Sequence, residues 1–271
     1  MAKYFLQKGE DRMVEMDKKL LTQRLVDLLR LDTNPVGVKL YRQREELPRR
    51  PFNWKINICQ LVCQARYQGK FGSGTPDLMV CAIGAACTGL IKTPERFTSG
   101  RAAVGRYVSE EEAGRKFMAN TYKLGDKGKQ YDAIYVGPVA GFKDLDPDVV
   151  VIYANPAQVM RLIHASLFET GDCVKADTVA EAALCSSIGF VLGEQKPVIG
   201  FPCAGDRTFG GTQKDELLFA LPFSFFQTLV ENLESLQMAV GQVYPVGPFM
   251  AWTPTMVPAY TMQPEDLEEG N

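Results

Sequence analysis

Histidine is nearly absent from this sequence, since His164 is the only one in 271 residues. Catalytic zinc and non-haem iron sites take several imidazole ligands, so a multi-histidine metal site within one chain is excluded. Any catalytic arrangement that needs a histidine base would have to use His164 alone. A lone histidine is more often a hydrogen-bonded structural residue than a catalyst, and we interpret His164 in that way.

Long apolar runs and an excess of charge of one sign are also absent. No run approaches the roughly 18 apolar residues of a membrane-spanning helix. The first residues lack the apolar core of a secretion signal. The net charge of −2 provides no basic field that would attract nucleic acid or an anionic membrane. We therefore expect a cytoplasmic protein that binds neither nucleic acid nor membrane.

The short-spaced Cys-x-x-Cys motif is missing as well, although the chain has seven cysteines. An odd number in a chain without an export signal argues against a disulfide framework. Cysteines that neither react nor bind a metal usually act as small buried hydrophobes, and that interpretation stays open for each of them. Cys59 and Cys63 are four residues apart in a predicted helix, so they share one face of it.

The apolar pattern that is present predicts an α/β fold, with α+β as the alternative. We expect a mixed sheet of about six to eight strands flanked by helices. Helices are predicted over residues 16–31, 56–67, 109–122, 157–168, 178–188 and 225–238. Strands are predicted over residues 36–41, 78–81, 133–136, 149–154, 197–203 and 217–221. Asn155 and Pro156 supply a cap and a first-turn proline for one helix, and Ser109 opens another with a capping-box pattern.

The last part of the chain differs from the rest in composition. Residues 1–241 read as a single domain, whereas residues 242–271 form a separate segment, with four prolines within 243–260 followed by an acidic tail. Proline prevents a central strand or a long helix there, while the aromatic residues between the prolines still need to be covered. We expect an extended C-terminal arm that packs on this domain or on a neighbouring subunit, which favours a homo-oligomer.

A series of short motifs runs through most of the chain, from about residue 20 to residue 238. The motifs are Asn34–Lys39, the helix of Cys59 ending at Gly69, Cys81–Gly84 with Gly89–Leu90, Pro147–Asp148, Asn155–Gln158 with Arg161, Cys185, and Cys203–Arg207. Their order resembles the domain-of-unknown-function 169 family, the archaeal ArCR group, which is common in archaea and anaerobic bacteria. The resemblance implies little about activity, because the family is named for its unknown function. It implies that Cys59, Cys81, Cys185 and Cys203 are the family's cysteines. It also implies that Cys63, Cys87 and Cys173 are additions of this sequence.

Four thiolates brought together by the fold could hold an iron–sulfur cluster or a structural zinc ion. We expect Cys59, Cys81, Cys185 and Cys203 to be the metal ligands. Cysteine-only ligation favours the iron–sulfur cluster, with a role in electron transfer to a redox partner or in substrate binding. Glycine N–H groups beside the cysteines and the charge of Arg207 would compensate the negative thiolates.

Two other functions are consistent with the same residues. In the first, Arg161, Asp206 and Arg207 grip an acidic small molecule without a metal, because the guanidinium fork suits carboxylate or phosphate. In the second, a cysteine activated by Arg207 or by a helix N-terminus acts as a nucleophile or as a redox-sensing thiol. The sequence indicates a site and does not identify a reaction.

Overall fold

A computed structural model describes residues 17–48, 54–240, 244, 262–263 and 266. In these residues seven strands form one sheet in the order β2-β3-β1-β4-β7-β6-β5. The strands are β1 Val36–Tyr41, β2 Gly72–Gly74, β3 Ala133–Pro138, β4 Val149–Ala154, β5 Lys175–Asp177, β6 Val198–Gly200 and β7 Leu217–Pro222. Only β5 and β6 pair in parallel, and the other neighbours pair antiparallel. The sheet is therefore mixed, and the predicted α/β class is confirmed.

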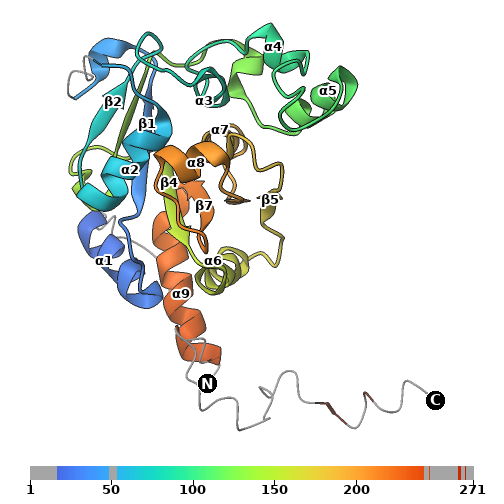
Figure 1. Cartoon of the computed structure of the whole chain (residues 1–271). Coiled ribbons are helices and arrows are strands. Elements are labelled where there is room, and N and C mark those ends of the chain that lie inside the picture. Colours follow the sequence, from blue (N-terminus) through green and yellow to red (C-terminus); the bar gives the residue numbers. More distant parts are fainter. Residues whose placement is uncertain (1–16, 49–53, 241–243, 245–261, 264–265, 267–271) are drawn as a thin grey trace.

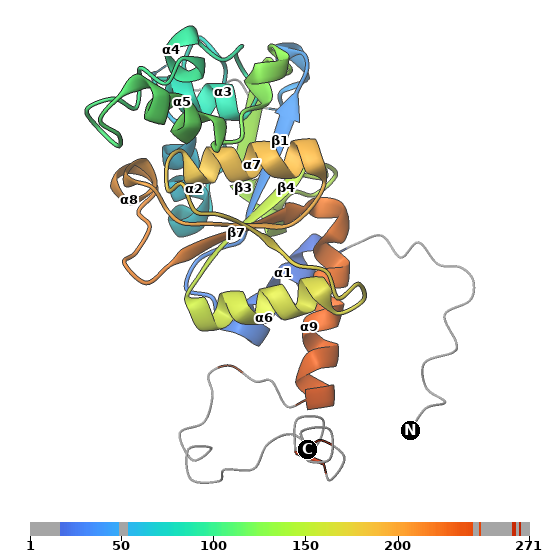
Figure 2. The same cartoon turned by 90° about the vertical axis from the view of Figure 1, so that its right-hand side faces the viewer.

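Helices cover both faces of this sheet. They are α1 Lys18–Leu29, α2 Ile58–Gln68, α3 Ala82–Cys87, α4 Glu95–Thr98, α5 Glu111–Ala119, α6 Pro156–Leu167, α7 Ala183–Glu194, α8 Ala204–Phe209 and α9 Phe226–Val240. The helices α1, α6 and α9 pack on one face, and α2, α3 and α7 pack on the other. Figure 1 and Figure 2 show these two layers on opposite sides of the strands, with α4 and α5 set apart near α3.

Strand β4 lies in the middle of the sheet and explains the two cores. All six of its residues are buried, as expected for a strand covered on both faces. Successive side chains point to opposite faces, so the strand contributes alternately to two clusters. The first cluster receives Val149, Val151 and Tyr153, and the second receives Val150, Ile152 and Ala154.

The predicted helix start after β4 is confirmed in detail. Asn155 caps α6 through a capping box with Gln158, and Pro156 occupies the first helical position. The Gln158 side chain also donates from Nε2 to the carbonyl of Leu29, 2.8 Å away, near the end of α1. One polar residue thus closes α6 and joins it to α1.

Two local predictions were wrong. Instead of a strand over 78–81, residues 76–78 form a turn in which the N–H groups of Leu78 and Met79 donate to the carbonyl of Thr75, and only an isolated bridge joins Met79 to Ile56. Helix α5 does form, but it begins after Glu110, whose side chain makes no capping hydrogen bond. The capping-box pattern at Ser109 is therefore not used.

The predicted C-terminal arm lies almost wholly outside the described residues, so its packing and the homo-oligomer stay predictions. Tyr244 is described, and its hydroxyl accepts a hydrogen bond from Asn155 Nδ2 at 2.6 Å. Among the helices that the structure describes, none combines the length and the apolar character required to cross a bilayer.

Candidate cysteine site

The four cysteines that the sequence singles out each lie at the beginning of a different helix. Cys59 is the second residue of α2, and Cys185 is the third residue of α7. Cys81 and Cys203 are the residues that immediately precede α3 and α8. Backbone N–H groups near a helix start lack intrahelical partners, so a helix start can offer hydrogen-bond donors to a nearby sulfur.

Two of these helix starts, those of α3 and α7, meet at Gly84. A Cβ atom on Gly84 would stand 3.0 Å from the sulfur of Cys185 and 3.4 Å from the sulfur of Cys81. The Cys185 thiol is hydrogen-bonded to Cys59, and Cys59 interacts electrostatically with both Cys81 and Cys203. Glycine is needed at position 84 because any side chain would press on the sulfur of Cys185. The structure therefore brings Cys59, Cys81 and Cys185 together near Gly84, and it places Cys203 within electrostatic range of Cys59.

Backbone N–H groups donate hydrogen bonds to two of the four sulfurs. Cys81 accepts hydrogen bonds from the N–H groups of Ile83 and Gly84. Cys203 accepts from the N–H groups of Asp206 and Ala183, which belong to two different helices, α8 and α7. Such donors stabilise negative charge on sulfur. They are suited to a thiolate or to an anionic group that the thiolates hold.

Burial nevertheless keeps the thiols protonated. Cys185 and Cys203 are only 4% and 7% exposed, and Cys59 and Cys81 are half-buried. Desolvation raises the pKa of Cys81, and it raises the pKa of Cys203 to about 11. The hydrogen bond with Cys59, followed by desolvation, raises the pKa of Cys185 well above its usual value. At neutral pH these three groups are thiols, which are poor nucleophiles.

A strained loop fixes the start of α7. Ala180 and Ala182 adopt left-handed backbone angles, with φ of 56° and 51°, which costs an alanine about 1–2 kcal/mol. The helix begins at Ala183, later than the predicted start at residue 178. This late start presents the N–H of Ala183 to Cys203 and the N–H of Leu184 to the Asp206 carboxyl. The strained loop thus lies where the start of α7 contacts Cys203 and Asp206.

A buried polar chain lies beside Cys203. Asp206 is fully buried, and its Oδ1 accepts a hydrogen bond from the Tyr153 hydroxyl at 2.9 Å. The Arg66 guanidinium lies 3.7 Å from the centre of the Tyr153 ring, and its Nη2 donates to Glu216 Oε1 at 2.5 Å. Burial outweighs the favourable bonds and raises the pKa of Asp206 to about 6.

Sequence reasoning missed Arg66 and Tyr153. Both lie within elements that were predicted correctly, a helix and a buried strand, and their apolar neighbours give no sign of a polar partner. Asp206 Oδ2 has no hydrogen-bond partner in the described part of the chain. The only sequence signal for this buried chain is Arg66 itself, an arginine on the apolar face of a predicted helix. A buried arginine requires a polar or charged partner.

The two predicted ligand arginines do not join the site. Arg161 lies on α6, on the opposite face of the sheet, where its Nη1 donates to the carbonyl of Leu28 at 2.6 Å. It thereby satisfies a carbonyl of the last turn of α1. Arg207 is exposed, and its Nη1 donates to the carbonyl of Gln213 at 3.0 Å. Of the three residues proposed to grip an acidic ligand, only Asp206 lies beside the cysteines.

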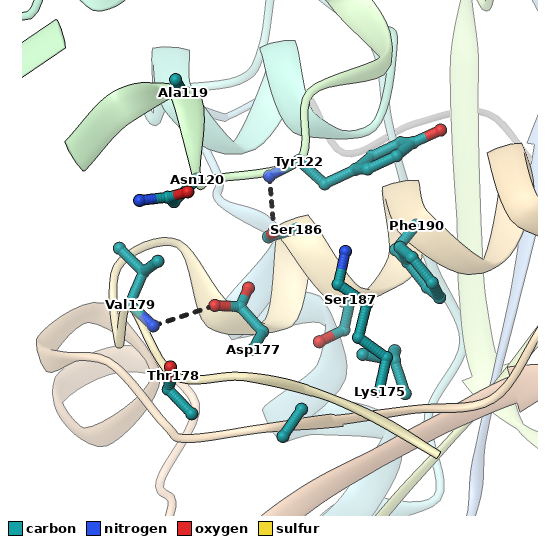
Figure 3. Close-up of a pocket in the computed structure, with 12 residues that line it drawn as sticks. Ala119, Asn120, Tyr122, Lys175, Asp177, Thr178, Val179, Ser186, Ser187 and Phe190 are labelled. Carbon is teal, nitrogen blue, oxygen red and sulfur yellow. Dashed lines mark hydrogen bonds between the residues drawn. The ribbon is translucent and has the colours of Figure 1, made fainter. Parts of the chain in front are cut away.

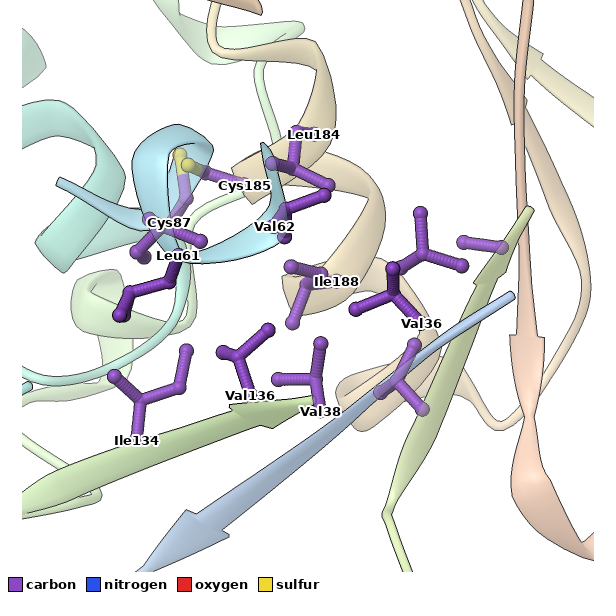
Figure 4. Packing of buried hydrophobic residues seen from close by; sticks show 14 of the residues in the cluster. Val36, Val38, Leu61, Val62, Cys87, Ile134, Val136, Leu184, Cys185 and Ile188 are labelled. Carbon is purple, nitrogen blue, oxygen red and sulfur yellow. The ribbon is translucent and has the colours of Figure 1, made fainter. Parts of the chain in front are cut away.

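The remaining cysteines have separate surroundings. Cys87 is fully buried in the core, and desolvation raises its pKa well above the usual value. Figure 4 shows Cys87 and Cys185 on the side of this cluster that faces away from the strands. Cys63 is one helical turn from Cys59 and lies beside Gly211, whereas Cys173 is exposed. Cys87 thus fits the description of a small buried hydrophobe.

Comparison with known proteins identifies the family. The sequence model of DUF169, described as Uncharacterised ArCR, matches residues 24–232. The chain belongs to the DUF169 family. A similar protein is the uncharacterized protein MJ0308 of Methanocaldococcus jannaschii, which is 27% identical over 220 residues, covering 78% of this chain and 91% of that protein. No solved structure matches this DUF169 chain.

All four gathered cysteines lie within the DUF169 match, as do Tyr153 and Asp206. Within the described residues, no group of three or more histidine, cysteine, aspartate or glutamate side chains is placed to hold a metal ion. The DUF169 site therefore has four neighbouring thiols without the tight donor set of a preformed single-ion centre.

Proposed function

We propose that this DUF169 protein binds an iron–sulfur cluster through Cys59, Cys81, Cys185 and Cys203. The observation that carries the proposal is the proximity of these thiols at the starts of four separate helices. Cys81 and Cys185 flank Gly84, Cys59 is hydrogen-bonded to Cys185, and Cys203 lies within electrostatic range of Cys59. Cysteine thiolates are the usual ligands of such clusters, and four of them match the common ligand number.

The electrostatics of the site argue against a reactive thiol. A catalytic or sensing cysteine needs a lowered pKa, and the pKa values of Cys81, Cys185 and Cys203 are raised. Iron can displace the thiol protons, since metal binding requires deprotonated sulfur and releases protons. The N–H groups directed at Cys81 and Cys203 would then face the negative charge of the cluster.

The donor arrangement favours a cluster over a single zinc ion. A zinc ion with four thiolates at about 2.3 Å needs its donors tightly gathered around one point. No such group exists among the described residues. A cluster distributes its cysteines over several iron atoms, so its ligands need not surround one point.

When bound, the cluster would supply one-electron transfer or a Lewis-acidic iron. The chain's own contribution is to bury the thiols, present backbone donors and place the Asp206–Tyr153 pair beside Cys203. We place this function in the cytoplasm, where thiols stay reduced, with a redox protein as partner. A homo-oligomer assembled through residues 242–271 belongs to the same proposal.

Reconstitution with individual cysteine variants tests the proposal. The wild type and four single variants, Cys59→Ser, Cys81→Ser, Cys185→Ser and Cys203→Ser, are incubated anaerobically with ferrous iron and sulfide, desalted, and compared by visible absorption. We expect a brown wild type and, in each variant, a loss of most of the absorption or a changed spectrum. Cys63→Ser is the matched control, because it lies on the same helix as Cys59 and its sulfur faces Gly211.

Equal iron and sulfide content in the wild type and all four variants would refute the ligand assignment. Circular dichroism of each iron-free variant separates a missing ligand from a misfolded chain. Cys173→Ser provides a second control at an exposed cysteine outside the site.

A second function, a reversible disulfide, is favoured by the hydrogen bond between Cys59 and Cys185. Oxidised glutathione would accept two electrons and two protons as these thiols join, leaving two molecules of reduced glutathione. Mass spectrometry of the oxidised, digested protein would then show a Cys59–Cys185 crosslink. If those two cysteines remain alkylatable after oxidation, this second function is rejected while the cluster proposal stands.

A further inference from the structure

A cavity of about 400 Å³ lies beside α7, in the region where β5 and the end of α5 approach this helix. Figure 3 shows it, with Asn120 and Tyr122 on one side and β5 on the other. Ser186 and Ser187 of α7, the residues that follow Cys185, contribute to its wall. The volume falls in the usual range for a small-molecule site, which runs from about 300 to 1,000 Å³.

Two opposite charges enter this cavity from one strand. Lys175 and Asp177 are two residues apart on β5, so their side chains lie on the same side of the strand. Figure 3 shows both side chains turned toward α7. In the described structure no ion pair joins them: the Lys175 ammonium lies 4.9 Å from the centre of the Phe190 ring, and the Asp177 carboxylate accepts from the N–H of Val179 at 3.1 Å. Each charge retains bonding capacity for a ligand.

A buried hydroxyl without a partner lies in the wall of the cavity. Ser187 lines the cavity and is only 1% exposed, yet its Oγ has no hydrogen-bond partner in the described residues. Leaving a buried hydroxyl unpaired costs stability, and most buried hydroxyls have a partner. The unpaired hydroxyl, together with two opposite charges that form no ion pair with each other, points to a polar ligand that supplies the missing bonds.

We propose that this cavity binds a small zwitterion, an L-α-amino acid with a polar uncharged side chain. Lys175 would receive the carboxylate, Asp177 would receive the ammonium, and Ser187 would bond a polar group of the ligand. Only a molecule that carries both charges uses Lys175 and Asp177 together, and charge-assisted hydrogen bonds are the stronger ones. This site does not depend on the iron–sulfur proposal, because its residues are distinct from the four cysteines.

Isothermal titration calorimetry of the full-length, cluster-free protein tests the site. The probes are L-serine, L-threonine, L-asparagine and L-glutamine at millimolar concentration. We expect saturable binding of at least one of them. The matched probes for serine are ethanolamine, which lacks the carboxylate, and 3-hydroxypropionate, which lacks the ammonium. Each should bind about tenfold more weakly, or worse, because each loses one charged contact.

Substitutions of Lys175 and Asp177 test whether the ligand binds in this cavity. Lys175→Met and Asp177→Asn should each weaken binding of the best probe about tenfold or more. Lys196→Met and Asp172→Asn are the controls, because these exposed charges lie outside this cavity and should leave binding unchanged. Lys175→Arg keeps the charge and should retain most of the affinity, which separates lost charge from lost fold.

Ser187→Ala distinguishes a ligand contact from a structural role. Removing an unpaired hydroxyl should leave the melting temperature of the ligand-free protein unchanged or raise it, and should weaken binding several-fold. A lowered melting temperature with unchanged binding would show that Ser187 is structural. Absence of saturable binding for all four amino acids, or wild-type affinity in both charge variants, overturns the proposal and leaves the cluster proposal unaffected.

Discussion

The two faces of the sheet are built on different principles. On the face of α1, α6 and α9, hydrocarbon side chains fill the core, and buried polar side chains such as Gln158 and Asn232 bond backbone carbonyls. On the face of α2, α3 and α7, the core contains thiols with raised pKa values and borders the buried Asp206 carboxyl. The first face is mostly hydrocarbon and buries one charged side chain, Arg161, whereas the second combines buried thiols with a buried carboxyl. The second face is therefore the place to look for function.

The largest expected effect lies on the first face. Phe226 is fully buried at the start of α9 and stacks near Phe223. Phe226→Ala should lower the free energy of unfolding by ~3–5 kcal/mol, because it removes a large apolar side chain and leaves a cavity. Urea unfolding of the iron-free protein, followed by circular dichroism, measures the change.

The matched variant on the other face is Cys185→Ala. Its expected cost in the same measurement is only about 1 kcal/mol, since a single sulfur is removed. If Cys185→Ala costs as much as Phe226→Ala, the two faces do not differ in kind, and the cysteines are there for packing.

Asp206→Asn should stabilise the iron-free protein. The folded-state pKa of Asp206 is about 6, raised by burial from the ordinary 3.8. A raised pKa means that the folded state prefers the protonated carboxyl, so this contribution to stability is complete below about pH 3.8 and is lost as the pH rises through about 6. At pH 7.5 the neutral amide should therefore raise the free energy of unfolding by ~1–3 kcal/mol.

The pH profile is the stricter part of this test. Unfolding of the wild type between pH 4 and pH 7 should show stability falling with pH through the Asp206 titration, and the variant should lack that component. A variant less stable than the wild type at pH 7.5 would mean that the charged carboxylate is a stabilising partner of Arg66. Burial of Asp206 would then not be a cost to stability on the second face.

The smallest stability effect is expected at Gly84. Alanine favours a helix by about 0.5–1 kcal/mol, but its Cβ would stand 3.0 Å from the sulfur of Cys185, so the net change should stay within ~1 kcal/mol. Iron content after reconstitution should nevertheless fall clearly in Gly84→Ala. Gly205→Ala is the control, because its Cβ would meet the sulfur of Cys203 at an ordinary 3.7 Å. Equal iron content in both variants would contradict a cluster centred near Gly84.

Elements with strong local signals could be predicted from the sequence. Strand β4 is a continuous run of β-branched and aromatic residues, and α6 has its cap and proline in adjacent positions. Strands β2 and β5 could not be predicted, because Gly-Ser-Gly and Lys-Ala-Asp have neither apolar alternation nor β propensity. They are strands only because β3 and β6 offer edges to pair with.

The sequence pointed to the cysteines and gave little sign of their buried polar neighbours. The family resemblance pointed to Cys59, Cys81, Cys185 and Cys203, and the fold joins them through helix starts that are distant in the sequence. The interpretation of Arg161 and Arg207 as ligand residues rested on the match between a guanidinium group and an acidic ligand. Residue type does not set the direction of a side chain, and α6 carries Arg161 to the other face.

The most direct measurement is the iron and acid-labile sulfide content of the wild-type protein, purified without oxygen, together with its visible spectrum. The account predicts brown protein with iron and sulfide in similar amounts, and loss of both when Cys185 is replaced by serine. Colourless protein that contains neither iron nor sulfide, before and after reconstitution, would contradict it.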